Sequence, residues 1–155
     1  MDSQKIINTK KHLVIAFFAI AITMLCTWNV MAQEATKAGS ITITVNIDNC
    51  KNDDGHVLLG LHTAETFMKG PGVKNAKVTI ENGKTTATFT NVLPGTYAIM
   101  ALHDMNDNNR MDFDVNGMPQ EHYGLSGNEM SFGPPQFVDA KFEAKEENLH
   151  FDIRF

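Results

Sequence analysis

A short segment near the middle of the chain places oxygen-bearing side chains at alternate positions. Asp104, Asn106 and Asn108 occupy positions 1, 3 and 5 of a linear loop, and Asp112 occupies position 9. Alternate side chains converge when such a loop curls, and calcium takes six to eight oxygen ligands from carboxylates, amides, backbone carbonyls and water. The spacing therefore predicts a calcium-binding loop over residues 104–112.

Five neighbouring residues decide how complete the calcium shell would be. Arg110 supplies a backbone carbonyl at position 7, and Asn109 replaces the glycine usual at position 6, where asparagine tolerates the left-handed backbone. Position 12 is Val115 instead of a bidentate glutamate, and no helical pattern flanks the loop. The loop is therefore not an EF-hand, and Asp114 or Glu121 is the residue expected to close the shell.

The same residues allow two other interpretations. Asp and Asn side chains also fill ordinary polar turns, because they bond to backbone groups two residues away. Alternatively, His103 lies beside Asp104 and His122 follows Glu121. Such pairs can act as a general base or bind zinc, which would make residues 103–122 the site of a metal- or His/carboxylate-dependent hydrolase. The chain has no nucleophile motif to support catalysis, so a non-enzymatic domain is the preferred interpretation.

Aromatic residues in this segment suggest a recognition surface. Phe113 and Tyr123 lie among the carboxylates, and His103 begins the same segment, so all three are candidates for a ligand or partner surface. Exposed aromatics at loop ends can contact a protein or glycan partner. They can equally cover a small core of the loop itself, and the sequence specifies no oligomeric state.

The distribution of charge bears on partners and on the loop. The chain carries 13 Lys and Arg and 18 Asp and Glu; without residues 1–32 these become 10 and 17, a net charge of −7. No basic patch is present, which excludes nucleic acid as a partner. Residues 104–121 contain five carboxylates, and Arg110 is the only Lys or Arg among them. Crowded carboxylates repel one another, so this imbalance favours a bound cation.

The elements that must position the loop are strands. Residues 41–47 alternate isoleucine and valine with polar residues, and residues 56–62 form a second apolar run. Residues 96–103 are apolar at both alternating sets of positions, which is typical of a central strand. The acidic loop begins where this central strand ends.

A tight hairpin is predicted around Asn82-Gly83, the preferred pair for a type I′ turn. The apolar residues then share one face, and the threonines and charged residues share the other. The predicted pairs are Glu81 with Lys84, Thr79 with Thr86, Val78 with Ala87, and Ala76 with Phe89.

Three further segments complete the expected domain. Residues 63–72 suggest one helical turn, with Phe67 and Met68 closing the end of the core, and residues 137–142 and 149–155 suggest strands. About seven short strands without an amphipathic helix predict an all-β fold, a single Ig-like or transthyretin-like antiparallel β-sandwich spanning residues 40–155.

The N-terminus predicts export. Three lysines precede the apolar run HLVIAFFAIAITMLC, and small residues end it at Ala32, which is the pattern of a cleaved signal peptide over residues 1–32. The run is too interrupted for the ~20 apolar residues of a membrane span. Residues 33–39 are predicted to form a flexible tail after cleavage, which would leave Cys50 as the only cysteine. The expected location is the periplasm or the extracellular space, with no membrane contact after cleavage.

The chain resembles the bacterial family called domain of unknown function 2141 in the segments GTYAIMALHDMNDNNRMDFDVNGMPQEHYGLSGN and GPPQFVDAKF. It departs from the family pattern at Asn109, where the family has glycine, and at Leu125, where it has phenylalanine. The resemblance implies an exported β-sandwich domain of undetermined activity, and it directs attention to residues 103–126. Shared residues are His103, Asp104, Asn106, Asn108, Asp112, Gly117, Pro119, Glu121, Tyr123, Gly124, Ser126, Pro135, Phe137 and Ala140.

Overall fold

The computed structural model describes residues 40–129 and 133–155. The predicted signal peptide and the tail over residues 33–39 lie outside this range. No helix in the described ranges is both long and apolar enough to cross a membrane. The elements are β1 (Ile41–Ile47), β2 (His56–His62), β3 (Lys74–Val78), β4 (Thr85–Val92), β5 (Gly95–Asp104), β6 (Tyr123–Leu125), α2 (Phe137–Ala140), β7 (Phe142–Ala144) and β8 (Leu149–Asp152).

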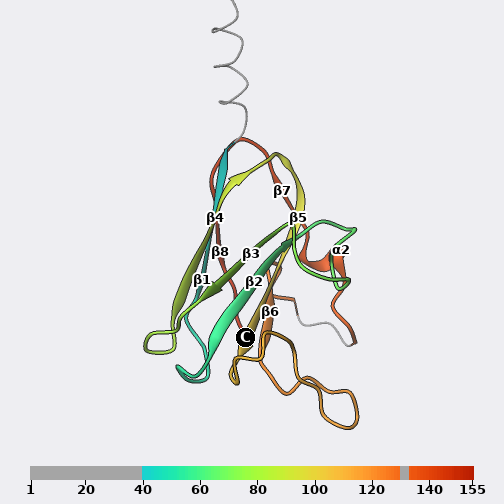
Figure 1. The fold of residues 1–155 in the computed structure, drawn as a ribbon. Coiled ribbons are helices and arrows are strands. Elements are labelled where there is room, and N and C mark those ends of the chain that lie inside the picture. The colour runs from blue at the N-terminus through green and yellow to red at the C-terminus, as the bar shows by residue number, and fades with distance from the viewer. Residues whose placement is uncertain (1–39, 130–132) are drawn as a thin grey trace, which may run out of the picture. The chain divides into compact units, whose positions relative to one another are not determined.

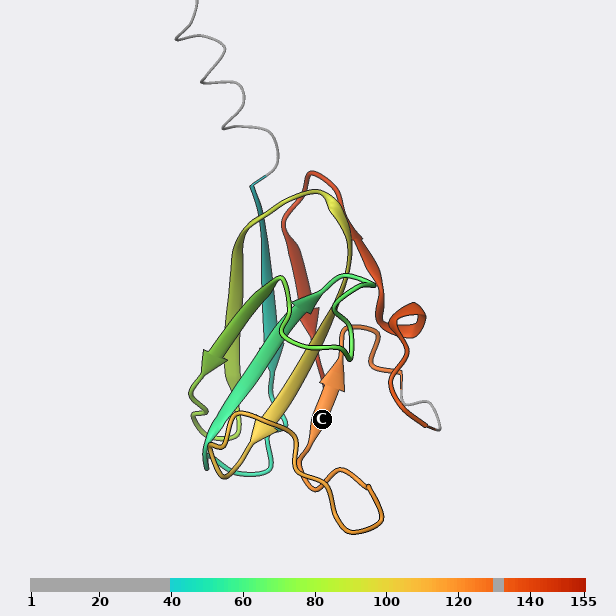
Figure 2. The ribbon, with the colours of Figure 1, turned by 45° about the vertical axis from the view of Figure 1, so that its right-hand side comes forward.

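Two sheets pack face to face (Figures 1 and 2). One has the strand order β4-β1-β8, and the other has the order β3-β2-β5-β6, with β7 also paired to β5. The prediction of an all-β sandwich is confirmed. Two details differ, because the described residues contain eight strands and because β8 runs parallel to β1.

The core lies between the inner faces of the two sheets. In β1 the predicted alternation is confirmed, since every second residue is buried. The facing sheet contributes the alternate residues of β2 and β5, including Leu59 and Ile99. The outer face of the five-stranded sheet therefore carries the other set: His56, Leu58, Gly60 and His62 of β2, paired in register with Asp104, Leu102, Met100 and Ala98 of β5.

β5 is the central strand of its sheet, as predicted. β2 pairs along one of its edges from Ala98 to Asp104. Its other edge is shared, because β7 pairs at Gly95–Tyr97 and β6 at Met100–Leu102. The end of β5 is thus held on both sides next to the acidic loop that follows it.

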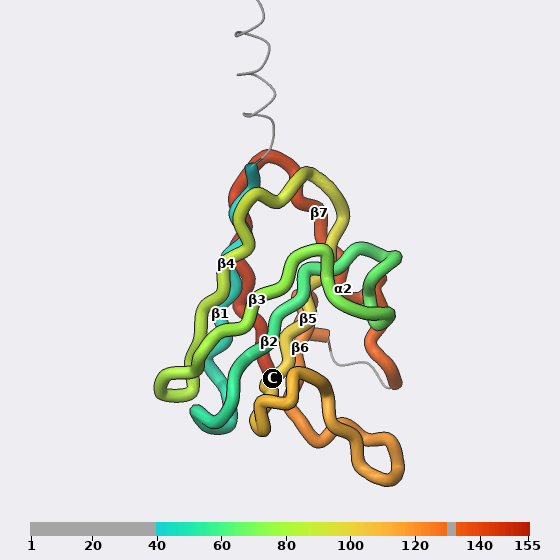
Figure 3. Tube along the Cα trace, viewed as in Figure 1, coloured from blue at the N-terminus to red at the C-terminus, as the bar shows by residue number. Residues whose placement is uncertain are grey.

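The hairpin prediction is correct at the turn and wrong in the strands. Asn82 (φ +54°) and Gly83 (φ +72°) have the positive φ values that a type I′ turn requires, and Glu81 bridges to Lys84. The predicted pairs at Thr79–Thr86, Val78–Ala87 and Ala76–Phe89 are not formed. β3 pairs with β2 and β4 pairs with β1, so the two arms enter different sheets, as the trace in Figure 3 shows. Each arm therefore pairs with a neighbouring strand of its own sheet and not with the other arm.

The predicted strand over residues 137–142 is also wrong in its first part. Residues 137–140 form the single turn of α2, and only then does β7 begin. In a helical turn Phe137 and Ala140 share one side, and both pack against Phe67 and Leu125 on the outer face of the five-stranded sheet. Phe67 is therefore buried there, whereas Met68, expected to help close the core, is 53% exposed.

Candidate functional site

Asp104 lies at the end of β5 and organises the start of the acidic loop. Its side chain is fully buried. Oδ1 accepts a hydrogen bond from the Asn108 amide (3.0 Å), and Oδ2 accepts one from the Asn109 amide (2.7 Å). Asn109 has φ +62°, so the left-handed conformation predicted at position 6 is confirmed. The carboxylate thus fixes the first turn of the loop.

The side chains at positions 3, 5 and 9 meet at one point. The Asn106 and Asn108 amide nitrogens lie 2.6 and 2.9 Å from the same oxygen, Oδ2 of Asp112. Their amide oxygens accept backbone N–H groups of Asn108 and Arg110. The structure therefore brings Asp112 together with both asparagines. The Arg110 guanidinium lies beside Asp112, with Nε 3.6 Å from Oδ1.

Glu121 connects the beginning and the end of the loop. It is 5% exposed, and its two carboxylate oxygens accept the amides of Met105 (3.0 Å) and Asp112 (3.2 Å). A carboxylate that accepts backbone N–H groups makes charge-assisted hydrogen bonds, which are about twice as strong as neutral ones. Glu121 thus closes residues 105–112 into a ring next to the start of β6.

Asp114 belongs to a separate turn at the tip of the loop. Its carboxylate accepts the amides of Asn116 and Met118, both at 2.8 Å. The Met118 amide in particular holds the pKa of Asp114 below its usual range. Asp114, predicted as a residue that could close the calcium shell, is therefore engaged by its own turn, apart from the Asn106–Asn108–Asp112 cluster.

Sequence reasoning missed the contacts that tie the loop to the sheet. Asp107 bonds to Lys77 of β3 and to Nδ1 of His56 of β2 (3.0 Å), and Lys77 also donates to Oδ1 of Asn109 (3.0 Å). The Lys77 hydrogen bond is the main cause that lowers the pKa of Asp107, with His56 adding to it. A lysine among alternating residues of a short strand carries no signal of this long-range contact.

Replacement of Lys77 by methionine is expected to raise the pKa of Asp107 toward its ordinary value. A carboxyl group whose pKa is lowered in the folded state stabilises the fold at pH values above its ordinary pKa. That stabilisation is lost as the pH falls through the lowered pKa. The variant should therefore lose less stability in acid than the parent chain. Carboxyl ¹³C NMR titration of Asp107 checks the pKa, with Lys74→Met as control. Identical Asp107 titrations in parent and variant would contradict the contact.

His103 is buried inside the sandwich, which corrects its prediction as part of a recognition surface. It is 0% exposed, its Nε2 lies 2.9 Å from the Asp54 carbonyl oxygen, and its ring stacks on Phe155 at 6.1 Å. Within the described residues its Nδ1 has no hydrogen-bond partner. Successive residues of a strand point to opposite faces, so His103 and Asp104 form no catalytic pair. Glu121 is likewise engaged by backbone amides and not by the exposed His122.

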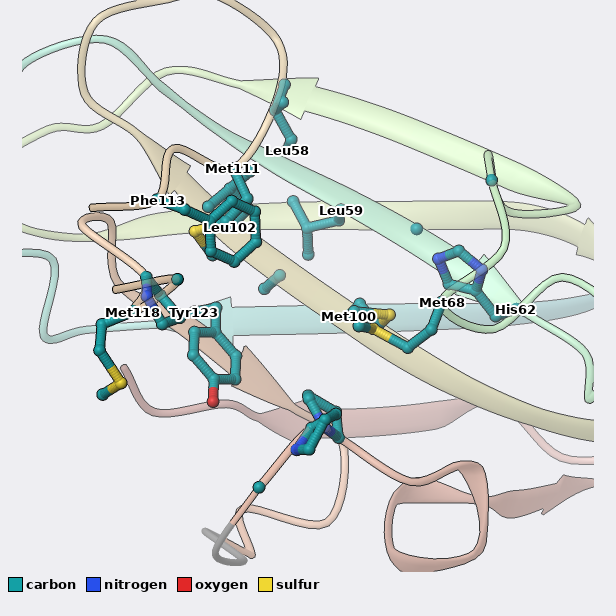
Figure 4. A pocket seen from close by; sticks show the side chains of 18 residues that line it. Leu58, Leu59, His62, Met68, Met100, Leu102, Met111, Phe113, Met118 and Tyr123 are labelled. Atoms are coloured by element: carbon teal, nitrogen blue, oxygen red, sulfur yellow. The ribbon is translucent and has the colours of Figure 1, made fainter. Parts of the chain in front are cut away.

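A cavity of about 800 Å³ lies on the outer face of the five-stranded sheet. Leu58, Met100 and Leu102 form its floor, and the acidic loop contributes Met111, Phe113 and Met118 as a wall, with Tyr123 of β6 beside them (Figure 4). Phe113 and Tyr123, the aromatics predicted for a recognition surface, thus lie in one pocket. The remaining lining residues are Leu59, Gly60, His62, Met68, Gly70, Ala101, Gly117, Pro119, Gly133, Pro134 and Pro135.

His62 is the polar group at the end of the pocket away from the loop. Its Nδ1 lies 3.3 Å from the Thr66 carbonyl oxygen, which can only accept, so Nδ1 carries the proton and Nε2 is left with a lone pair. Burial lowers the pKa of His62 and favours this neutral form. Nε2 lies 2.3 Å from the place where a Cβ on Gly60 would be, so the ring occupies space that only glycine leaves free.

A family model described as "Uncharacterized protein conserved in bacteria (DUF2141)" matches residues 45–152. The chain belongs to this family. The matched range includes the acidic loop and the residues that line the pocket, so both features fall within the family domain. No curated protein and no solved structure matches the chain. The description of the family names no activity, and the chemistry of the site rests on its geometry.

The donors of the loop are suited to a hard cation more than to zinc. Across residues 40–129 and 133–155, no three His, Cys, Asp or Glu side chains are grouped closely enough to hold a metal ion. The cluster instead combines one carboxylate with two amides, beside the buried Asp104. Amide, carboxylate and carbonyl oxygens together with water are the ligands that calcium accepts.

Proposed function

We propose that this chain is an exported, non-enzymatic binding domain in which calcium orders the acidic loop and the loop forms one wall of a ligand pocket. The observation that carries the proposal is the convergence of Asn106, Asn108 and Asp112 within hydrogen-bonding distance of one another. These are positions 3, 5 and 9, and Asp104 at position 1 accepts the backbone amides of Asn108 and Asn109.

The residues present fit calcium. Each carboxylate oxygen of Asp104 accepts one backbone amide and keeps a second lone pair, and rotation of the two asparagine amides would turn their oxygens toward Asp112. The backbone carbonyl of Arg110 and water molecules would supply the remaining ligands. A divalent cation would also offset the negative charge of Asp112 and of the buried carboxylates of Asp104 and Glu121, which accept backbone amides of the same loop.

Calcium in the loop would act on the pocket through the chain itself. Met111 and Phe113 flank Asp112 in sequence, and both line the cavity. A ligand that holds Asp112 in place therefore restricts the two side chains beside it. A cavity of 300–1,000 Å³ lined by apolar and aromatic side chains with few polar groups has the properties of a small-ligand site. The predicted signal peptide over residues 1–32 supports export. Calcium is more concentrated outside the cell than in the cytoplasm, so a weak site could be filled there.

A thermal melt in calcium and in chelator tests the proposal. At a calcium concentration of 100 times Kd, binding should stabilise the folded chain by about 2.7 kcal/mol, which raises Tm by several degrees. Asp112→Asn is expected to abolish most of this shift, because Asp112 is the point on which the cluster converges. Differential scanning calorimetry at matched ionic strength, with magnesium as a second ion, measures the effect.

Asp114→Asn is the matched control. It removes the same charge from the same loop, but Asp114 bonds only to its own turn. The control should keep the calcium shift of the parent chain. Superimposable melts of the parent chain in calcium and in chelator would refute calcium binding, and equal losses in both variants would refute the assignment of the cluster as its site.

A further inference from the structure

The lining of the pocket carries no charge. Among the described residues it contains no Asp, Glu, Lys or Arg side chain. Its histidine has no free ring nitrogen for a ligand, because Nδ1 of His62 is bonded to the Thr66 carbonyl oxygen and Nε2 lies against Gly60. Burial of a charged or unpaired polar group in such a site is costly. A ligand is therefore expected to be uncharged and apolar where it meets the lining.

The floor of the pocket is a strip of apolar side chains that is two strands wide. Leu58 of β2 is paired with Leu102 of β5. Two residues further along the ladder, Gly60 is paired with Met100, and paired residues project to the same face of a sheet. Four steps along β2 separate Leu58 from His62, which amounts to about 13 Å. The floor is therefore long and narrow, and it follows the direction of the strands.

Apolar side chains at both ends of this strip are exposed to solvent. Met68 is 53% exposed at one end, and Phe113 and Met118 are 59% and 63% exposed at the other (Figure 4). Exposed apolar groups that gather around a groove mark a binding site, because a ligand that covers them removes apolar surface from water. Methionine side chains are flexible and adapt to the shape of an apolar partner. The rim can therefore close over a flexible ligand.

The floor offers nothing to the backbone of a peptide. In the described part of the chain β2 is paired with β3 and β5, and β5 is paired beside the pocket with β2 and β6. Extended peptides bind to sheets by adding a strand to a free edge, and neither floor strand has a free edge at the pocket. A peptide laid across them would bury unpaired N–H and C=O groups, which is costly. A hydrocarbon chain has no such groups.

We propose that the pocket binds the single aliphatic chain of an amphiphile whose head group is uncharged and stays in solvent. Among the described lining residues four are methionine and three are leucine, whereas the rings of Phe113 and Tyr123 lie at one end only, which favours a chain over a flat ring. The acidic loop disfavours an anionic head group, since residues 104–121 carry five carboxylates and one arginine and stay net negative with one calcium ion bound. The inference rests on the proposed function in taking this pocket as the ligand site, and it does not require calcium.

A series of n-alkyl maltosides from hexyl to dodecyl, each below its critical micelle concentration, tests the proposal. Isothermal titration calorimetry of the purified chain should give one molecule bound per chain. Kd should fall about fourfold for each added methylene until the chain fills the groove, and should then stay constant. Affinity that rises through the whole series without a defined stoichiometry would mean adsorption to apolar surface and would overturn the proposal.

Four other probes identify the competing ligands: maltose, 4-methylumbelliferyl maltoside, decanoate and phosphatidylcholine vesicles. Decyl maltoside should bind more tightly than the first three. Equal affinity for maltose would indicate a sugar site, equal affinity for the aromatic maltoside would indicate a ring site, and equal or tighter binding of decanoate would indicate an anion site. Binding to vesicles without binding to the alkyl maltosides would indicate a membrane surface. Each of these results would overturn the proposal.

A double variant of the floor locates the chain in the pocket. Leu58→Thr/Leu102→Thr keeps the β-propensity of both positions and places two hydroxyl groups on the floor. Its affinity for decyl maltoside should fall by at least about 30-fold, because a ligand would bury both hydroxyl groups unpaired. The matched control, Leu93→Thr/Val138→Thr, changes two exposed apolar residues outside the lining and should bind as the parent does. Equal losses in the two variants would place the chain elsewhere.

Methionine-methyl NMR of the parent chain gives a measurement that does not depend on the folding of a variant. Decyl maltoside should shift the methyl signals of the four lining methionines, Met68, Met100, Met111 and Met118. Met105 lies outside the lining, and its signal should stay in place. Unshifted lining signals at saturation would overturn the proposal.

The titrations are made in EGTA and repeated in calcium. Binding of decyl maltoside that persists while the calcium melts superimpose refutes only the calcium-ordered loop. A calcium-dependent melt without binding of any alkyl maltoside refutes only the aliphatic ligand.

Discussion

Replacement of Asp104 by alanine should lower the free energy of unfolding by about 3–5 kcal/mol. Each backbone N–H bond to a buried carboxylate contributes about 1.5–3 kcal/mol, and Asp104 accepts two, from Asn108 and Asn109. Without the carboxylate both amides lose their partner, and the turn that places Asn109 in the left-handed conformation is no longer held. Urea unfolding in chelator measures the change without any contribution from calcium.

Asp114→Ala provides the comparison for this prediction. Asp114 also accepts two backbone amides, but at the tip of the loop, where solvent can replace the carboxylate. Its loss should be much smaller than that of Asp104→Ala, and Asp104→Asn should fall between the two because one acceptor oxygen remains. Equal destabilisation by Asp104→Ala and Asp114→Ala would show that the buried carboxylate does not organise the loop.

The sequence predicts which face each strand buries more reliably than it predicts the partner of the strand. Alternation with period two correctly identified the inner residues of β1 and the central position of β5. The same rule paired Val78 with Ala87, because both are apolar and equidistant from the Asn82-Gly83 turn. In the fold these residues belong to opposite sheets, with Val78 paired to Val57 and Ala87 to Val45. The hydrophobic pattern of a segment does not indicate which of the two sheets that segment joins.

The turn itself shows why the two arms separate. Asp53, from the segment after β1, accepts the backbone amides of Asn82 (2.9 Å) and Gly83 (2.7 Å), and the Cys50 amide donates to the Gly83 carbonyl. The turn is therefore fixed to a segment 30 residues earlier in the chain. Contacts of this kind depend on the completed fold, as does the link between Asp107 and Lys77.

The candidate site likewise has one part that is local in sequence, the loop, and one part that depends on the completed fold, the pocket. Positions 1, 3, 5, 6 and 9 of the loop are close in sequence, and their spacing predicted which side chains meet at Asp112 and where the left-handed residue falls. The pocket combines β2, β5, β6, the acidic loop, the segment after β2 and the Pro134–Pro135 segment. Phe113 and Tyr123 were predicted for a recognition surface, because aromatics near a loop stand out locally, but the pocket itself was not predicted. His62 and Met100 become neighbours only through the β2–β5 register.

Gly55→Ala should destabilise the fold by disturbing the point where β5 passes into the acidic loop. Gly55 has φ +66°, and a Cβ added to it would lie 1.9 Å from the carbonyl oxygen of Asp104. The left-handed backbone costs an L-residue about 1–2 kcal/mol, and overpacking against a fixed neighbour adds about 1–3 kcal/mol. The expected loss is therefore about 2–5 kcal/mol in urea unfolding. The clash would also push Asp54 away from His103, whose Nε2 bonds the Asp54 carbonyl.

Gly117→Ala separates the cost of the left-handed backbone from the cost of the steric clash. Gly117 has φ +80° but no atom within 4 Å of an added Cβ, so its substitution carries only the backbone cost of about 1–2 kcal/mol. The difference between the two variants measures the contact between the turn at Gly55 and the backbone of Asp104. In ¹H–¹⁵N spectra Gly55→Ala should shift the amides of Asn108 and Asn109, which bond to the Asp104 side chain, whereas Gly117→Ala should leave them in place. Equal stability losses and unshifted amides would mean that the turn and the loop are not coupled, and that Asp104 holds its position without Gly55 behind it.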